Sequence, residues 1–160
     1  MTESNPGPTE APAPASVTLK VLIAEDHEYI RMALSALLGA HGVEVVGEAD
    51  NGRTAVELAG RLRPDLVIMD MSMPDLAGPE ATRRVRADLP TTRVIALSAH
   101  CDREWVEAAL QAGASAYVLK DVAYDDLPRA LEAVSAGRHF VSQRIPGAAA
   151  ALAAHLSRQA

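Results

Sequence analysis

The sequence predicts an α/β fold in which a doubly wound parallel sheet carries helices on both faces. Five short apolar runs alternate with stretches whose apolar residues recur every three or four positions. Polar residues follow four of these apolar runs directly. Alternating strands and helices favour parallel strands joined by helical crossovers, and right-handed crossovers place helices on both faces of the sheet.

Each expected strand is an apolar run, and each expected helix carries an apolar stripe. The strands are expected at residues 20–24, 43–49, 66–69, 93–98 and 116–119. A helix over 79–89 begins at a proline, which suits a first helical position. The other helices are predicted by four stripes: Ile30, Leu34, Leu37 and Leu38; Ala55, Leu58, Ala59 and Leu62; Val106, Ala109, Leu110 and Gly113; Leu127, Ala130, Leu131 and Val134.

Polar side chains lie where the expected strands end, at the edge where open α/β sheets bind ligands. They are Glu25 and Asp26 after the first strand, Asp70 after the third, Ser98 after the fourth and Lys120 after the fifth. The strand order is not visible in the pattern. If it is the flavodoxin-like order 2-1-3-4-5, the three carboxylates share one crevice, with the serine and the lysine along its other wall. Asp50 is then left on the far edge.

Length and composition predict one domain with additional residues at each end. We expect a disordered Pro/Ala-rich tail over residues 1–16, a folded domain over 17–140, and a linker or C-terminal helix over 141–160. A stripe of Ala149, Leu152, Ala153 and Leu156 supports the helix. The single cysteine, Cys101, fits a reducing compartment, and no apolar run is long enough to span a membrane. We therefore expect a soluble cytoplasmic protein.

Four motifs in this order resemble the receiver domains of bacterial two-component response regulators. They are "AEDH", "VIMDMSMPDLAG", "ALSAH" and "AYVLKD", and the similarity covers about residues 19–140. The resemblance is to the NarL/LuxR-type subfamily, whose receivers precede a helix-turn-helix DNA-binding domain. It implies that Asp70 accepts a phosphoryl group from a histidine of a sensor kinase, and that Lys120 and Ser98 contact that group.

The same resemblance implies a Mg²⁺ ion. Asp26 and Asp70 would bind it directly, the backbone carbonyl of Ser72 would supply a further oxygen, and Glu25 would act largely through water. The charges agree with this, because one close pair of carboxylates costs roughly 4 kcal/mol at an effective dielectric constant of 20. A divalent cation relieves that repulsion, and hard oxygen ligands suit Mg²⁺.

Several of these residues have simpler interpretations. Asp70 could cap a turn, and Lys120 could be an exposed lysine at a strand end. The resemblance makes Tyr117 a switch residue that moves inward when Ser98 turns toward the phosphoryl group. It could equally be an edge-strand tyrosine with a solvated hydroxyl. His27 could tune the acidic pair, but an exposed loop histidine is the simpler interpretation.

Two other functions compete with the signalling one. Haloacid-dehalogenase-type phosphatases also use a strand-end aspartate, Mg²⁺ and a lysine, but they need a second acid two residues later, where this chain has Ser72. A degenerate receiver that only binds partners is disfavoured because every site residue is present. The chain departs from the commonest receiver pattern in Glu25, usually aspartate, and Ser98, often threonine. We expect a phosphoacceptor signalling domain, capable at most of self-phosphorylation from small donors and of autodephosphorylation.

The expected partners follow from charge and from the resemblance. The net charge of −6 argues against binding of nucleic acid by this chain. Residues 143–160 carry only two arginines and no lysine, too few to meet DNA phosphates. We expect the chain to be the regulatory part of a longer transcription regulator that binds DNA, the alternative being a stand-alone receiver. We also expect a homodimer on phosphorylation, through the first and last helices or the face of the fifth strand, and no membrane contact.

Overall fold

One parallel sheet of six strands forms the centre of the protein, in the order β2-β1-β3-β4-β5-β6. This computed structural model describes residue 7 and residues 18–159, so the predicted tail over 1–16 falls outside the described residues apart from Gly7. The predicted order 2-1-3-4-5 is confirmed for the first five strands. The strands are β1 (Lys20–Ala24), β2 (Glu44–Ala49), β3 (Leu66–Asp70), β4 (Arg93–Ser98), β5 (Ala116–Leu119) and β6 (Phe140–Val141).

The sixth strand was not expected from the sequence. It is only two residues long, too short to show alternation, and it pairs with β5 through Ala116 and Tyr117. As a result β5 is not the edge of the sheet.

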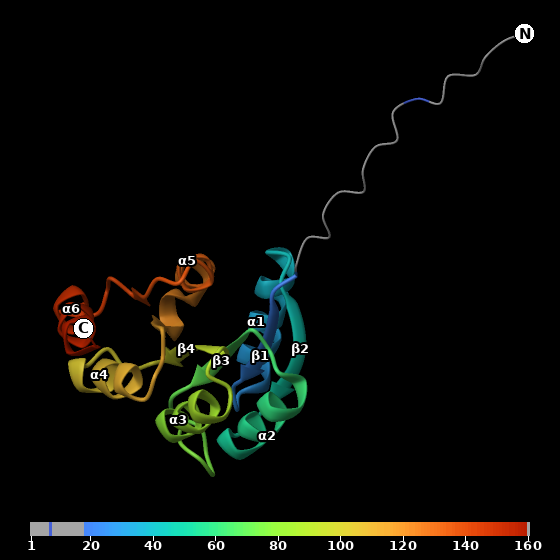
Figure 1. Ribbon diagram of the computed structural model, residues 1–160, viewed down its shortest axis with the longest axis horizontal. Coiled ribbons are helices and arrows are strands. Elements are labelled where there is room, and N and C mark those ends of the chain that lie inside the picture. Colours follow the sequence, from blue (N-terminus) through green and yellow to red (C-terminus); the bar gives the residue numbers. More distant parts are fainter. Residues whose placement is uncertain (1–6, 8–17, 160) are drawn as a thin grey trace, which may run out of the picture.

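Helices cover both faces, as predicted (Figure 1). α1 and α5 pack on one face, while α2, α3, α4 and α6 contribute to the core on the other. A single 3₁₀ turn over Lys120–Val122 leads from β5 into α5. The helices are α1 (Glu28–Ala40), α2 (Gly52–Leu62), α3 (Gly78–Asp88), α4 (Arg103–Gln111), α5 (Ala123–Ser135) and α6 (Ala148–Gln159).

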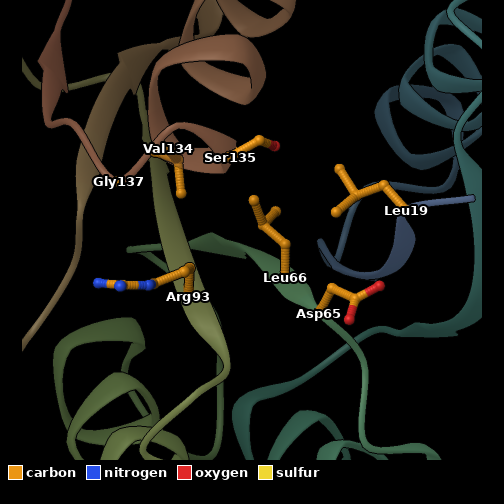
Figure 2. Close-up of a pocket in the computed structure, with 7 residues that line it drawn as sticks. All are labelled: Leu19, Asp65, Leu66, Arg93, Val134, Ser135 and Gly137. Carbon is orange, nitrogen blue, oxygen red and sulfur yellow. The ribbon is translucent and has the colours of Figure 1, made fainter. Parts of the chain in front are cut away.

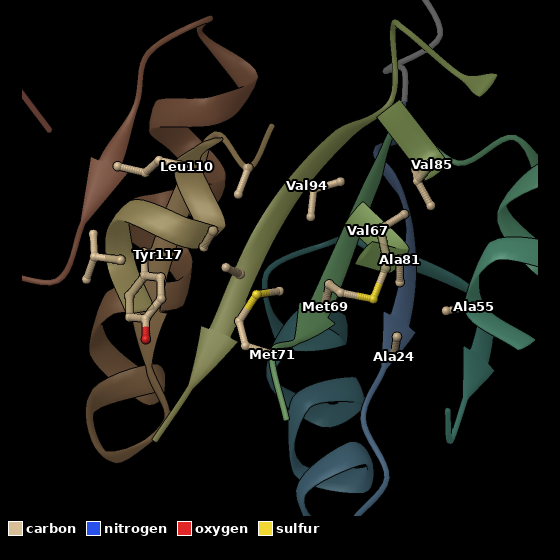
Figure 3. Close-up of a cluster of buried hydrophobic side chains, with 14 of the residues drawn as sticks. Ala24, Ala55, Val67, Met69, Met71, Ala81, Val85, Val94, Leu110 and Tyr117 are labelled. Carbon is tan, nitrogen blue, oxygen red and sulfur yellow. The ribbon is translucent and has the colours of Figure 1, made fainter. Parts of the chain in front are cut away.

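Two apolar clusters lie on opposite faces of the sheet because neighbouring residues of a strand point to opposite sides. In β1, Val21 and Ile23 join the cluster under α1 and α5, whereas Leu22 and Ala24 join the other. Figure 3 shows the second cluster, in which Tyr117 is the only labelled aromatic side chain. Burial on both faces explains why the central strands are continuous apolar runs.

The loop after β3 is held by a close approach at Gly78, the first residue of α3. A Cβ atom there would clash with the carbonyl oxygen of Asp70 and with Met71. Gly78 is not among the positive-φ glycines. The lack of a side chain, rather than backbone freedom, lets α3 begin directly against the end of β3.

Helix α6 packs on α4 beyond the edge of the sheet (Figure 1). Its buried residues are Ala148, Ala151 and His155. The stripe expected from the sequence was wrong by one position, because Ala149 and Ala153 are exposed and Leu156 is 41% exposed. None of the described helices has the length and apolarity needed to cross a membrane.

Candidate functional site

Four charged residues meet at the carboxyl ends of the strands. Glu25 follows β1, Asp70 ends β3, and Lys120 follows β5. The Lys120 ammonium lies 3.0 Å from Glu25 Oε2 and 3.1 Å from Asp70 Oδ2. Asp26 is the residue after Glu25, and its side chain interacts with Asp70. The predicted crevice is thus present, with the lysine between the two buried carboxylates.

These carboxylates differ in their exposure to solvent. The side chains of Glu25 and Asp70 are 0% and 1% exposed, whereas that of Asp26 is 27% exposed. A buried carboxylate needs donors. Glu25 receives them from Lys120 and from the backbone N–H of His27, and the imidazole Nδ1 of His27 lies 3.1 Å from its Oε1. Asp70 accepts the backbone N–H of Ser72 at 3.0 Å.

The environment separates the pKa values of the two aspartates. Burial raises the pKa of Asp70 to about 6; the charge of Glu25 adds to this, while the Ser72 N–H and Lys120 oppose it. Burial also acts to raise the pKa of Asp26, but its hydrogen bond with Asp70 and the charge of His27 outweigh burial and lower that pKa. Asp70 therefore has the higher proton affinity of the two aspartates.

Lys120 stays charged although it is partly buried. Burial alone would lower its pKa, but the hydrogen bonds and charges of Glu25 and Asp70 outweigh that effect and raise it. The lysine is therefore a permanent positive charge between two carboxylates.

The donor set fits a hard divalent cation. Glu25 Oε2 and Asp26 Oδ1 are buried oxygens that accept no hydrogen bond, although Glu25 Oε2 is ion-paired with Lys120. Oxygen or nitrogen atoms of Glu25, Asp26 and His27 lie within 4.8 Å of one another. Unsatisfied carboxylate oxygens beside further acidic groups are the ligands that Mg²⁺ prefers.

Comparison with known proteins decides the family. The family model for the response regulator receiver domain matches residues 21–132 of this chain. The chain belongs to this family.

The relatives of this receiver domain include regulators of the predicted NarL/LuxR type. The response regulator protein VraR of Staphylococcus aureus is 38% identical over 122 residues, which cover 76% of this chain and 58% of VraR. The chain thus matches less than two thirds of that relative. A LuxR-family response regulator of Aurantimonas sp. SI85-9A1 superposes with a TM-score of 0.79 at 33% identity, covering 83% of this chain and 96% of the other.

Two further solved receivers have the same fold. The receiver domain of the putative regulator NarL of Mycobacterium tuberculosis gives a TM-score of 0.71 at 36% identity, covering 76% of this chain and 98% of that one. The isolated receiver domain of RcsB from Salmonella enterica serovar Typhimurium was solved with the phosphomimetic BeF3−. It gives a TM-score of 0.75 at 26% identity, covering 81% of this chain and 96% of the RcsB domain. These similarities confirm the expected NarL/LuxR type.

In this receiver the Ser98 hydroxyl is engaged away from Asp70. It accepts the backbone N–H of His100 at 3.0 Å. The Tyr117 hydroxyl donates to the carbonyl oxygen of His100 at 2.7 Å. The His100 ring stacks on Trp105 of α4, with centroids 3.8 Å apart. Ser98, Tyr117 and α4 are therefore linked through one residue.

Tyr117 points inward and is fully buried. Burial raises the pKa of its hydroxyl to about 12. The alternative of a solvated hydroxyl at a sheet edge does not describe this structure, because β6 covers that edge of β5 and the hydroxyl is hydrogen-bonded to His100.

Figure 2 shows a pocket whose lining residues Leu66 and Arg93 begin β3 and β4, so it lies at the opposite ends of these strands from the acidic crevice. It has a volume of about 470 Å³ and opens at the amino ends of the strands, beside the last turn of α5. Its only charged lining residues are Asp65 and Arg93. Nothing in its lining resembles the constellation around Asp70.

Two further contacts support the receiver site, and sequence reasoning missed one of them. Arg31, one turn into α1, donates from Nη1 to the carbonyl oxygen of Glu25 at 2.7 Å and pairs with Glu48 of β2 at 3.6 Å. His27 is 67% exposed, as the simpler interpretation had it, yet its ring also contacts both Glu25 and Asp26. The position of His27 beside the acidic pair gave a signal, but no pattern in the sequence pointed to Arg31.

Proposed function

We propose that Asp70 is the phosphoacceptor of a two-component signalling module and that a sensor histidine kinase is the donor. The observation that carries this proposal is the surroundings of Asp70. It is a buried carboxylate with a charged lysine at 3.1 Å, at the edge of the sheet where three carboxylates meet. Its raised pKa of about 6 still leaves it mostly ionised, and so nucleophilic, at neutral pH.

The transfer step is a displacement at phosphorus. A carboxylate oxygen of Asp70 forms a bond to phosphorus as the bond to the donor histidine nitrogen breaks, and the leaving imidazole takes up a proton. Lys120 faces the charge that develops on the phosphoryl oxygens, since its ammonium already lies beside Asp70 Oδ2. The Ser72 N–H holds the other oxygen, Oδ1, and so fixes the orientation of the carboxylate.

The residues that would hold Mg²⁺ are Asp26 and Asp70 directly, the Ser72 carbonyl oxygen, and Glu25 through water. When bound, the ion neutralises charge on the phosphoryl oxygens. Glu25 has a second task in this structure, because it shares Lys120 with Asp70. The longer glutamate side chain thereby keeps the lysine close to Asp70.

Ser98 and Tyr117 are proposed as the switch. The serine hydroxyl ends the strand next to Asp70 and is bonded to the His100 N–H, so it can exchange that partner for a phosphoryl oxygen. Tyr117 holds the carbonyl of the same residue. A rotation of the Ser98 hydroxyl therefore breaks one of the two hydrogen bonds that position His100.

The larger biological role is inferred from relatives. RcsB has been solved as dimers bound to DNA, and VraR is a response regulator protein that extends beyond the region matched here. We propose that this cytoplasmic receiver forms a homodimer when phosphorylated and controls a DNA-binding output domain in a longer transcription regulator. With a net charge of −6, the receiver itself would not bind DNA.

Acetyl phosphate with Mg²⁺ tests the proposal. We expect one phosphoryl group per chain, stable to acid and labile to base, seen as a single mass increment of the intact protein. Asp70→Asn should abolish it, whereas Asp65→Asn, at the other end of the same strand, should retain it. Unchanged labelling of Asp70→Asn would exclude Asp70 as the acceptor. Catalytic hydrolysis of an added phosphomonoester, in place of stoichiometric labelling, would favour the phosphatase.

A further inference from the structure

Helix α6 lies on a surface that is connected to the proposed switch. Its buried stripe consists of Ala148, Ala151 and His155, and it packs on α4. Leu152 of the same helix is partly buried and packs against that core. Burial lowers the pKa of His155, so it packs as a neutral group at pH 7. The docking of α6 therefore depends on a few residues along one side of the helix.

The chain that leads into α6 is tied to β5 by Ser142. The Ser142 N–H donates to the Tyr117 carbonyl oxygen at 2.9 Å, and the Ser142 hydroxyl accepts the Leu119 N–H at 3.1 Å. Two further backbone bonds, from Ile145 to Ser142 and from Ala148 to Ile145, carry the chain into the helix. The start of α6 is thus tied to two residues of β5. One is the switch tyrosine, Tyr117, and the other is Leu119, which precedes the site lysine.

The surface under α6 is also tied to the switch, by the loop before α4. His100 is held at its N–H by Ser98 and at its carbonyl oxygen by Tyr117, and its ring stacks on Trp105 of α4. If Ser98 turns toward a phosphoryl group on Asp70, His100 loses one of these two holds. Since α6 rests on α4, a shift of α4 removes part of the surface to which α6 is docked.

We propose that α6 occupies the α4 face only while Asp70 is unphosphorylated, and that phosphorylation releases the helix and exposes that face. The inference rests on the proposed function for its trigger, but the coupling itself needs no phosphodonor. Removing the Tyr117 hydroxyl should loosen His100, and through it α4 and α6, in the unmodified protein. The occupant of the face in the resting state is this chain's own C-terminal helix.

Hydrogen–deuterium exchange at the α6 amides of the full chain tests this. Two variants calibrate it: Ala151→Glu places a charge on the buried stripe and should undock α6, whereas Ala150→Glu, on the exposed side of the same turn, should leave exchange unchanged. Tyr117→Phe, without phosphodonor, should speed α6 exchange about tenfold, the change expected for one lost hydrogen bond of typical strength. Amides of α5 serve as the internal control for global stability.

Acetyl phosphate or BeF3− with Mg²⁺ should move α6 exchange in the wild-type protein toward the Ala151→Glu value. Intact mass measures phosphorylation separately. A phosphorylated protein with unchanged α6 exchange would overturn the inference and leave the proposed function standing. Without phosphorylation, the proposed function and the trigger fail, and the Tyr117→Phe result still decides the coupling. Unchanged α6 exchange in Tyr117→Phe, or equal acceleration in α5 and α6, would overturn that coupling.

Discussion

At the carboxyl end of the sheet, three carboxylates and one lysine share a crevice in which Glu25 and Asp70 are fully buried. At the amino end of the same strands, Asp65 and Arg93 line the pocket of Figure 2, and both are exposed. There, Asp65 Oδ2 accepts the backbone N–H of Lys20 at 2.9 Å. The residue types at the two ends are alike, but their contact with solvent is opposite.

The difference shows that burial, and not composition, prepares a carboxylate for chemistry. In the crevice Glu25 and Asp70 are deprived of water, so the pKa of Asp70 rises, and both carboxylates hold the Lys120 ammonium between them. At the amino end water screens the charges, and an exposed pair contributes little. A ligand site therefore belongs to the end that contains desolvated groups, although the pocket of Figure 2 lies at the other end.

The largest effect expected from this comparison is a pH-dependent change in stability at Asp70. Its folded pKa of about 6 lies above the ordinary value of 3.8, so between about pH 4 and pH 6 the native state binds a proton that the unfolded chain has lost. Stability must then fall as pH rises through this window. Asp70→Asn should remove the loss, on the order of 2–3 kcal/mol at pH 7.

Urea unfolding of both proteins at pH 4.5 to 7, without metal, measures the effect. The quantity to compare is the difference between wild type and Asp70→Asn, because His139 and His155, whose pKa values burial lowers, contribute equally to both. If the difference in free energy of unfolding between the two proteins were constant from pH 4.5 to 7, burial would not raise the pKa of Asp70.

The next effect concerns Mg²⁺. Asp26→Asn removes a charge and replaces one carboxylate oxygen with an amide NH₂ group, which cannot bind a hard cation, so Mg²⁺ affinity should drop by about tenfold or more. Asp50→Asn is the matched control, since Asp50 follows β2 at the far edge of the sheet, where its side chain accepts a hydrogen bond from the neighbouring Asn51. Calorimetric titration measures both. Equal affinities of the two variants would place the ion elsewhere.

Much of the carboxyl end could be predicted from the sequence because topology and periodicity act together there. Uninterrupted apolar runs identified the buried strands, and the strand order brought Glu25, Asp70 and Lys120 into one crevice. Such a prediction needs only the ends of strands, which the pattern defines to within a residue. The polar groups that stop these runs are therefore visible without any knowledge of packing.

What could not be predicted depends on contacts between distant segments. β6 has too few residues to show a period, and the face that α6 buries was misjudged because an alanine-rich helix has no strong apolar stripe. The reason for Gly78 was also missed, since a close approach to Asp70 leaves no trace in local sequence. Arg31 reaches the Glu25 carbonyl only because α1 folds back over β1.

The smallest effect is expected at the amino end, where Asp65→Asn tests the other half of the comparison. Asparagine keeps an oxygen that can accept the Lys20 N–H, and the site is exposed, so only a screened charge is lost. The free energy of unfolding should change by no more than about 0.5 kcal/mol and should not acquire a new pH dependence between pH 4.5 and 7. Urea unfolding in parallel with Asp70→Asn measures it. A change in the free energy of unfolding as large as that of Asp70→Asn would contradict the comparison. It would mean that electrostatic interactions at the exposed amino end affect stability as strongly as those in the buried crevice.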